Sequence, residues 1–96
     1  MIFESLTESN RKNKRFKIVF SNPRRVIHFG DKYGDTYIDH FNKLKRDNYI
    51  KRHSKLPLEN WNEINPGSLS RYLLWGDDTD ILINLENYLN KFNIGL

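Results

Sequence analysis

Cysteine, alanine and glutamine are all missing from this sequence of 96 residues. Without cysteine the chain forms neither a disulfide framework nor a thiolate metal site, which fits a protein of a reducing compartment. No apolar run approaches the roughly 18 residues that a membrane-spanning helix needs. Polar and acidic residues also interrupt the N-terminus, where a signal peptide has its apolar core. We therefore expect an intracellular protein with no membrane contact.

Motifs of the common catalytic classes are missing as well. The chain has no GxxxxGKS/T, GxGxxG or GxSxG pattern, so it offers no standard phosphate loop, dinucleotide site or nucleophilic serine. Histidines and aspartates provide the ligand types of a divalent-metal nuclease, but no HxH or HExxH spacing joins them. The residues concerned are His28, His40, His53, Asp31, Asp35 and Asp39. We expect no catalytic residues, no metal and no cofactor, with a small metal-dependent nuclease kept as an alternative.

The formal net charge of +4 is unevenly divided along the chain. Residues 1–55 hold fourteen Lys/Arg and six Asp/Glu, whereas residues 56–96 hold two and six. A basic half of this kind favours a polyanionic partner, and an acidic end either faces solvent or pairs with another protein. The simplest alternative is a charged surface that only keeps the protein soluble.

Alternating apolar residues predict a strand over residues 15–21. Pro23 marks a turn, and β-branched residues indicate a returning strand over residues 24–29. The two strands would form a hairpin with one apolar face. His28 falls on its other face, where we expect a half-buried, hydrogen-bonded side chain.

Helical spacing of apolar residues predicts a helix over residues 37–53, with a break left open either near Asn42 or at Asp47–Asn48. The acidic run 77–80 predicts the start of a C-terminal helix, because aspartates cap the positive end of the helix dipole. We expect that helix to end at Gly95.

The densest apolar segment is NPGSLSRYLLWG, residues 65–76. We expect Ser68 to cap a short helix there, and a core built from Trp61, Tyr72, Leu73 and Trp75. The predicted fold class is α+β, with an N-terminal antiparallel β-hairpin packed by about three α-helices. The predicted organisation is a flexible leader over residues 1–13 and a single small α+β domain over residues 14–96.

Basic side chains are interleaved with aromatic ones in the hairpin and in the helix after it. Such a pattern favours contact with the phosphate backbone of DNA or RNA, without sequence preference. The residues predicted to make this contact are Arg15, Lys17, Arg24, Arg25, Lys43, Lys45, Arg46, Lys51 and Arg52.

Five short motifs occur in order along the chain: HFG at 28–30, the GDKYGDT loop, YIKRH at 49–53, a lone Trp61, and SRYLLWG at 70–76. Together they resemble a small uncharacterised protein family of nucleocytoplasmic large DNA viruses, the giant viruses. The resemblance implies a viral origin and a hairpin followed by helices, but no catalytic residue. The chain departs from the family pattern at DKYGDTYIDH, which has an extra residue, and at PGSL, where a Gly-aromatic pair is usual.

The resulting hypothesis is a non-enzymatic, basic viral protein that contacts the nucleic-acid backbone or the virion interior. Its location would be the cytoplasm or nucleus of an infected host cell, and the virion. The first alternative is a structural protein–protein interaction module of a viral assembly, with another viral protein as its partner. The second is the metal-dependent nuclease.

Overall fold

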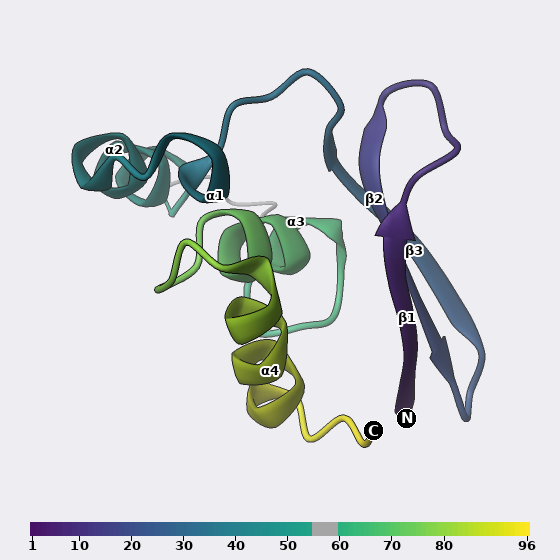
Figure 1. Ribbon diagram of the computed structural model, residues 1–96. Coiled ribbons are helices and arrows are strands. Elements are labelled where there is room, and N and C mark those ends of the chain that lie inside the picture. Colours follow the sequence, from purple (N-terminus) through teal and green to yellow (C-terminus); the bar gives the residue numbers. More distant parts are fainter. Residues whose placement is uncertain (55–59) are drawn as a thin grey trace.

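The computed structural model describes residues 1–54 and 60–96 and shows a three-stranded antiparallel sheet with helices against one face (Figure 1). The strands lie in the order β1-β2-β3. The α+β prediction is confirmed. The elements are β1 (Ile2–Glu8), β2 (Lys14–Ser21), β3 (Arg25–Asp31), α1 (Tyr37–His40), α2 (Lys43–His53), α3 (Pro66–Leu69), the π-helical turn η1 (Ser70–Leu74) and α4 (Ile81–Lys91).

The predicted hairpin is the β2–β3 pair, in which Phe16 lies opposite Phe29 and Ile18 opposite Ile27. These side chains alternate along each strand, so they all face the helices, and the last three are buried. They pack against Leu and Tyr side chains of η1 and α4 to form the core. The opposite sheet face carries polar and β-branched side chains and points away from the helices (Figure 1).

The prediction of a flexible leader over residues 1–13 is wrong for β1, which pairs with β2 along its whole length. A register shift between Phe3 and Ser5 adds one residue to β1. The shift puts Phe3 and Leu6 on the same inner face although they are three residues apart, which hides the period-2 pattern. The backbone N–H of Phe3 also donates to the carbonyl of Gly95, at 2.7 Å.

The break predicted near Asn42 is present and separates α1 from α2. Phe41 adopts a left-handed backbone conformation with φ of 56°, which ends α1. The Asn42 side chain then accepts a hydrogen bond from the backbone N–H of Lys45 and caps α2. Only Tyr49 of α2 is buried, so α2 is a largely polar helix on the surface.

In the segment 65–76 the predicted helix cap is wrong, and the second turn is wider than an α-helix. Asn65, and not Ser68, caps α3, because its side chain accepts from the Ser68 backbone N–H at 2.8 Å. The backbone N–H of Trp75 bonds to the carbonyl of Ser70, five residues back. This wide turn brings Leu74 to the buried side as well as Leu73.

The predicted aromatic core is therefore only partly right. Leu73 is fully buried, but Tyr72 and Trp75 are half-buried at the edge of the core. Trp61 is half-buried too, and the guanidinium of Arg71 lies over its ring at 5.3 Å. The fully buried aromatic side chains of the described residues are Phe20, Phe29 and Tyr88, and Tyr88 hydrogen-bonds to the Ser68 hydroxyl at 2.7 Å.

The C-terminal helix begins as predicted, since the Asp80 side chain accepts from the Leu82 backbone N–H. It ends before Gly95, however. Asn93 takes a left-handed conformation with φ of 54°, and the N–H of Ile94 returns to the carbonyl of Leu89. Asparagine tolerates this conformation through its short polar side chain, which leaves Gly95 to pair with the N-terminal strand.

Candidate functional site

Arg15 holds the sheet to α1 and is not available as a simple phosphate contact. Its two terminal nitrogens donate to both oxygens of Asp39, at 2.7 and 2.6 Å. The same carboxylate accepts from the backbone N–H and the hydroxyl of Thr36. Because these groups stabilise the charged form, the pKa of Asp39 lies well below its usual range, with the Arg15 hydrogen bonds as the largest cause.

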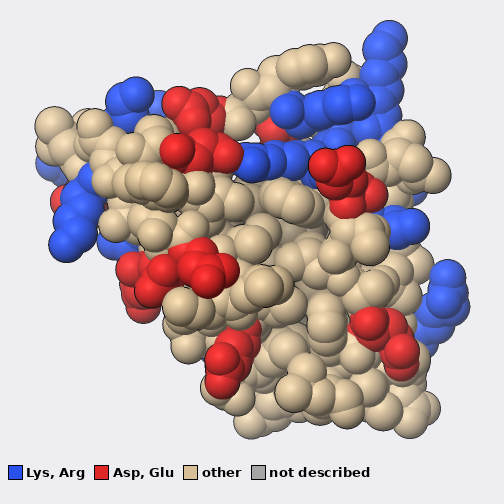
Figure 2. Space-filling model, viewed as in Figure 1, with Lys and Arg blue, Asp and Glu red and all other residues tan. Residues whose placement is uncertain are grey.

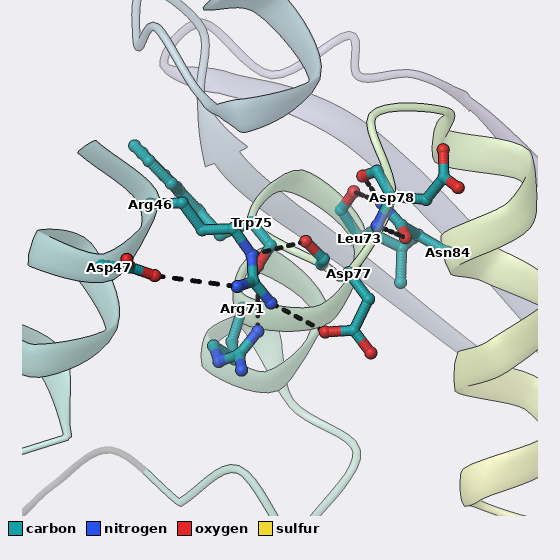
Figure 3. Close-up of polar contacts among 9 residues, drawn as sticks. Arg46, Asp47, Arg71, Leu73, Trp75, Asp77, Asp78 and Asn84 are labelled. Carbon is teal, nitrogen blue, oxygen red and sulfur yellow. Dashed lines mark hydrogen bonds and ion pairs between the residues drawn. The ribbon is translucent and has the colours of Figure 1, made fainter. Parts of the chain in front are cut away.

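Arg46 plays the corresponding part for α2 (Figure 3). Its Nε donates to the carbonyl of Gly76 and a terminal nitrogen donates to Asp77, both at 2.7 Å. Its guanidinium also lies over the ring of Tyr37, at 5.6 Å. Of the nine predicted contact residues, Arg15 and Arg46 therefore serve first to join elements of the fold.

The other predicted cations of α2 are exposed and form no ion pair with any acidic residue that the structure describes. They are Lys43, Lys45, Lys51 and Arg52. Blue side chains accordingly gather around α2 in Figure 2. We call these four residues the α2 cluster.

The hairpin cations are not all beside α2. Arg24 and Arg25 lie at the β2–β3 turn, at the end of the sheet that points away from α2 (Figure 1). Lys17 pairs with His28 across β2 and β3, on the sheet face that no helix covers. The structure thus divides the predicted residues between separate places and does not unite them in one basic face.

A second group of cations gathers at the opposite end of the sheet, around the β1–β2 loop. The backbone N–H of Lys32 donates to the carbonyl of Asn13, which brings the end of β3 to the loop. Figure 2 shows blue side chains over this loop. We call this group the loop cluster: Arg11, Lys12, Lys14, Lys17 and Lys32.

His28 lies close to the basic side chains of the loop cluster. Its Nδ1 is hydrogen-bonded to the Ser9 hydroxyl at 2.7 Å. The prediction of a half-buried, hydrogen-bonded side chain is therefore confirmed. The pKa of His28 is lowered, first by loss of hydration and then by the charges of Arg11, Lys17 and Lys14.

Four members of the loop cluster are absent from the predicted contact residues. The signal for three of them was the run from Ser9 to Gly30, which has seven basic residues and no acid.

An aromatic groove separates α2 from the loop before α1 and from η1. It consists of two cavities, of about 320 and 380 Å³, which share Asp35, Tyr49, Arg52 and Trp75. The rings of Tyr49 and Trp75 stack in parallel with centroids 4.3 Å apart, and His53 stacks on the other face of this pair, against Tyr49 at 4.1 Å.

His40 completes the wall of the smaller cavity, where its ring lies 5.3 Å from that of Trp75. Its Nδ1 accepts the backbone N–H of Asn42 at 2.9 Å. A neutral imidazole then carries its proton on Nε2. That atom is buried and has no hydrogen-bond partner among the residues the structure describes.

The three histidines do not converge. Within residues 1–54 and 60–96, no three histidine, aspartate or glutamate side chains gather in a way that could hold a metal ion. None of the helices described there is long and apolar enough to cross a membrane.

Comparison with protein families matches residues 4–53 to a family model described as "Family of unknown function (DUF5754)". The match covers more than half of the chain, which therefore belongs to this family. It runs from β1 to the end of α2 and so includes both basic clusters, whereas Trp75 lies beyond it. Searches of curated proteins and of solved structures gave no significant match.

Proposed function

We propose that this protein binds the phosphate backbone of nucleic acid through the loop cluster and the α2 cluster, without catalysis and without sequence preference. One observation carries the proposal. None of the nine side chains in these clusters forms an ion pair with an acidic residue in the described part of the chain, although Arg15 and Arg46 do. The ion pairs of the described residues thus involve Arg15 and Arg46, and the side chains of the two clusters keep their charge for an external anion.

Backbone contact of this kind has a defined signature. Lysine and arginine at a phosphate displace condensed counterions, so affinity falls linearly on a log–log plot against salt. Contact with about five phosphates gives a slope of roughly −3.5 on single strands to −4.5 on duplex. The affinity at physiological salt would be on the order of micromolar or weaker.

The resemblance to a giant-virus family supports a viral setting for this binding. The nucleic acid would then be that of an infected cell, in its cytoplasm or nucleus, or that enclosed in the virion. The excess of basic residues in the family-matched half of the chain agrees with such a role.

The test is a salt titration of binding to a blunt 20-base-pair duplex by three double charge reversals. Lys12→Glu with Lys14→Glu and Lys43→Glu with Lys51→Glu should each weaken binding strongly and flatten the salt slope by about two phosphate contacts. Arg24→Glu with Arg25→Glu makes the same change in net charge at the remote turn and serves as the matched control. Its effect should be much smaller, because charges separated by more than about 10 Å are largely screened at 0.1 M salt.

Two results would overturn the proposal. Equal losses in all three variants would mean that binding follows net charge alone. No salt-dependent binding by the wild type would favour the interaction module, for which α4 offers Leu82, 65% exposed, beside Leu96, 93% exposed.

A further inference from the structure

We propose that the aromatic groove holds one unpaired nucleotide of the bound strand, with phosphate contacts from Lys45 and Arg52 and the base against Trp75. The inference rests on the proposed function and adds to it a preference for single strands. It depends on three features of the groove: the cations of α2, the size and polarity of the cavities, and His40.

The first feature is the face that α2 turns toward the groove. Lys45, Asn48, Tyr49 and Arg52 all line it, and they stand at i, i+3, i+4 and i+7, which is one stripe of a helix. The two cations are about 10 Å apart along the axis, at 1.5 Å per residue. Lys51 and Lys43 lie off this stripe and do not line either cavity.

The second feature is the shape of the groove. The larger cavity, of about 380 Å³, has an apolar wall of Leu74 and Trp75 and hydroxyl groups from Thr36 and Ser70, and the carboxylates of Asp31 and Asp35 line it as well as Arg52. This volume and this mixture of an aromatic wall with a few polar groups are typical of small-ligand sites. A nucleobase presents an apolar ring face and polar edges, and stacking on aromatic side chains accepts any base.

The third feature is His40. It lines the smaller cavity, beside Lys45 and Arg52, and its Nε2–H has no acceptor among the described residues. Buried donors are normally paired. The His40 ring lines the smaller cavity, and its Nε2–H becomes available to a phosphate or base oxygen there when the ring turns toward the cavity.

A base in a duplex is paired and stacked and cannot enter the groove without leaving its helix. The groove therefore distinguishes single strands from duplexes, while the two basic clusters contact both. For this reason the preference for single strands can fail while duplex binding stands, and each is measured separately.

The experiment measures fluorescence anisotropy of the full chain with three probes at one salt concentration: a 12-nucleotide single strand, the same strand with abasic sites throughout, and the blunt duplex. The wild type should bind the normal strand at least fivefold tighter than the abasic strand. Arg52→Gln should lower the ratio of single-strand to duplex affinity, because its phosphate contact in the groove belongs to the unpaired nucleotide. Lys51→Gln, with the same charge loss one residue away, should weaken all three probes equally and leave the ratio unchanged.

Tryptophan fluorescence gives an independent reading of the same site. In Trp61→Phe, Trp75 is the only tryptophan, and its emission should be quenched by the normal strand but not by the abasic strand or the duplex. An equal response to normal and abasic strands, or equal effects of Arg52→Gln and Lys51→Gln on the ratio of single-strand to duplex affinity, overturns the inference. Salt-dependent duplex binding that persists in either case leaves the proposed function in place.

Discussion

Asn84 on α4 hydrogen-bonds to the backbone on both sides of Trp75, at Leu73 and Asp78. The substitution Asn84→Asp tests how much these bonds stabilise the fold. The side chain is 1% exposed. Its Nδ2 donates to the carbonyls of Leu73 and Asp78, at 3.0 and 2.7 Å, and its Oδ1 accepts from the Asp78 backbone N–H at 3.0 Å (Figure 3). Asparagine therefore uses both its donors and an acceptor to hold the segment that follows η1 against α4.

Aspartate keeps the size and the acceptor but replaces the donor nitrogen with an oxygen that faces two carbonyl oxygens. Each buried carbonyl left without its donor costs about 1–3 kcal/mol, so we expect Asn84→Asp to lower the free energy of unfolding by about 3–5 kcal/mol at pH 7. A chain of this length has about 5–14 kcal/mol in total. The variant should therefore be close to unfolding if the total lies at the lower end of this range, and measurably less stable than the wild type at the upper end.

The assay is urea denaturation of wild type, Asn84→Asp and Asn87→Asp at pH 7 and pH 4. Asn87 is exposed and lies one turn further along α4. Asn87→Asp therefore makes the same chemical change on the surface. Burial raises the pKa of a carboxyl, so the Asn84→Asp deficit should grow as pH rises above the unfolded-state pKa of about 3.9. A deficit under about 1 kcal/mol, or one equal to that of Asn87→Asp, would refute the reasoning.

Three further predictions concern the same framework. Asp39→Asn should lower the free energy of unfolding by about 1–2 kcal/mol at pH 7, because it removes the charge from the Arg15 pair. Since the folded-state pKa of Asp39 is depressed, the wild type should lose this extra stability as pH falls below about 4. Urea melts of both proteins across pH measure the difference. Gly30→Ala should cost about 2–4 kcal/mol, because φ there is +79° and a Cβ would lie 2.9 Å from a Leu74 methyl; Gly95→Ala, whose Cβ would meet only ordinary contacts at 3.8 Å, is the control, and equal melting temperatures would contradict the argument. Trp75→Ala should cost about 2–3 kcal/mol in urea, below the range for a fully buried tryptophan, since its ring is only half-buried; a loss under about 1 kcal/mol would mean that the ring stack adds nothing.

The strands β2 and β3 and the face of α4 could be predicted because each repeats apolar residues at one regular spacing. β1 could not, because its register shift places Phe3 and Leu6 three residues apart on one sheet face. The burial of Leu74 could not be predicted from the sequence for a similar reason. A bond from residue 75 back to residue 70 widens the helix, and an α-helical period then assigns the wrong side chains to the core.

The site was predictable in composition but not in arrangement. Sequence patterns find basic residues, yet they do not distinguish Arg15, which forms a two-point pair with Asp39, from Lys17, which forms none within the described residues. That distinction depends on which acid lies opposite after folding. Arginine is the residue most suited to such pairs because its planar fork matches a carboxylate, and the ion pairs among the described residues are all made by Arg15 and Arg46.

The attachment of α2 would link stability to the binding that we propose. With only Tyr49 buried, the helix has little apolar area to hold it, so its position depends on the Arg46 contacts to Gly76 and Asp77 and on the Tyr49–Trp75 stack. The same stack forms a wall of the groove. Tyr49 lies within the family-matched segment, whereas Trp75 and its neighbours in the groove lie after the end of that segment. A ligand that bridges α2 and Trp75 therefore adds a contact where the helix is least anchored. Such a ligand should stabilise the folded chain by RT ln(1 + L/Kd), where L is its free concentration, which rises with the logarithm of that concentration above its dissociation constant.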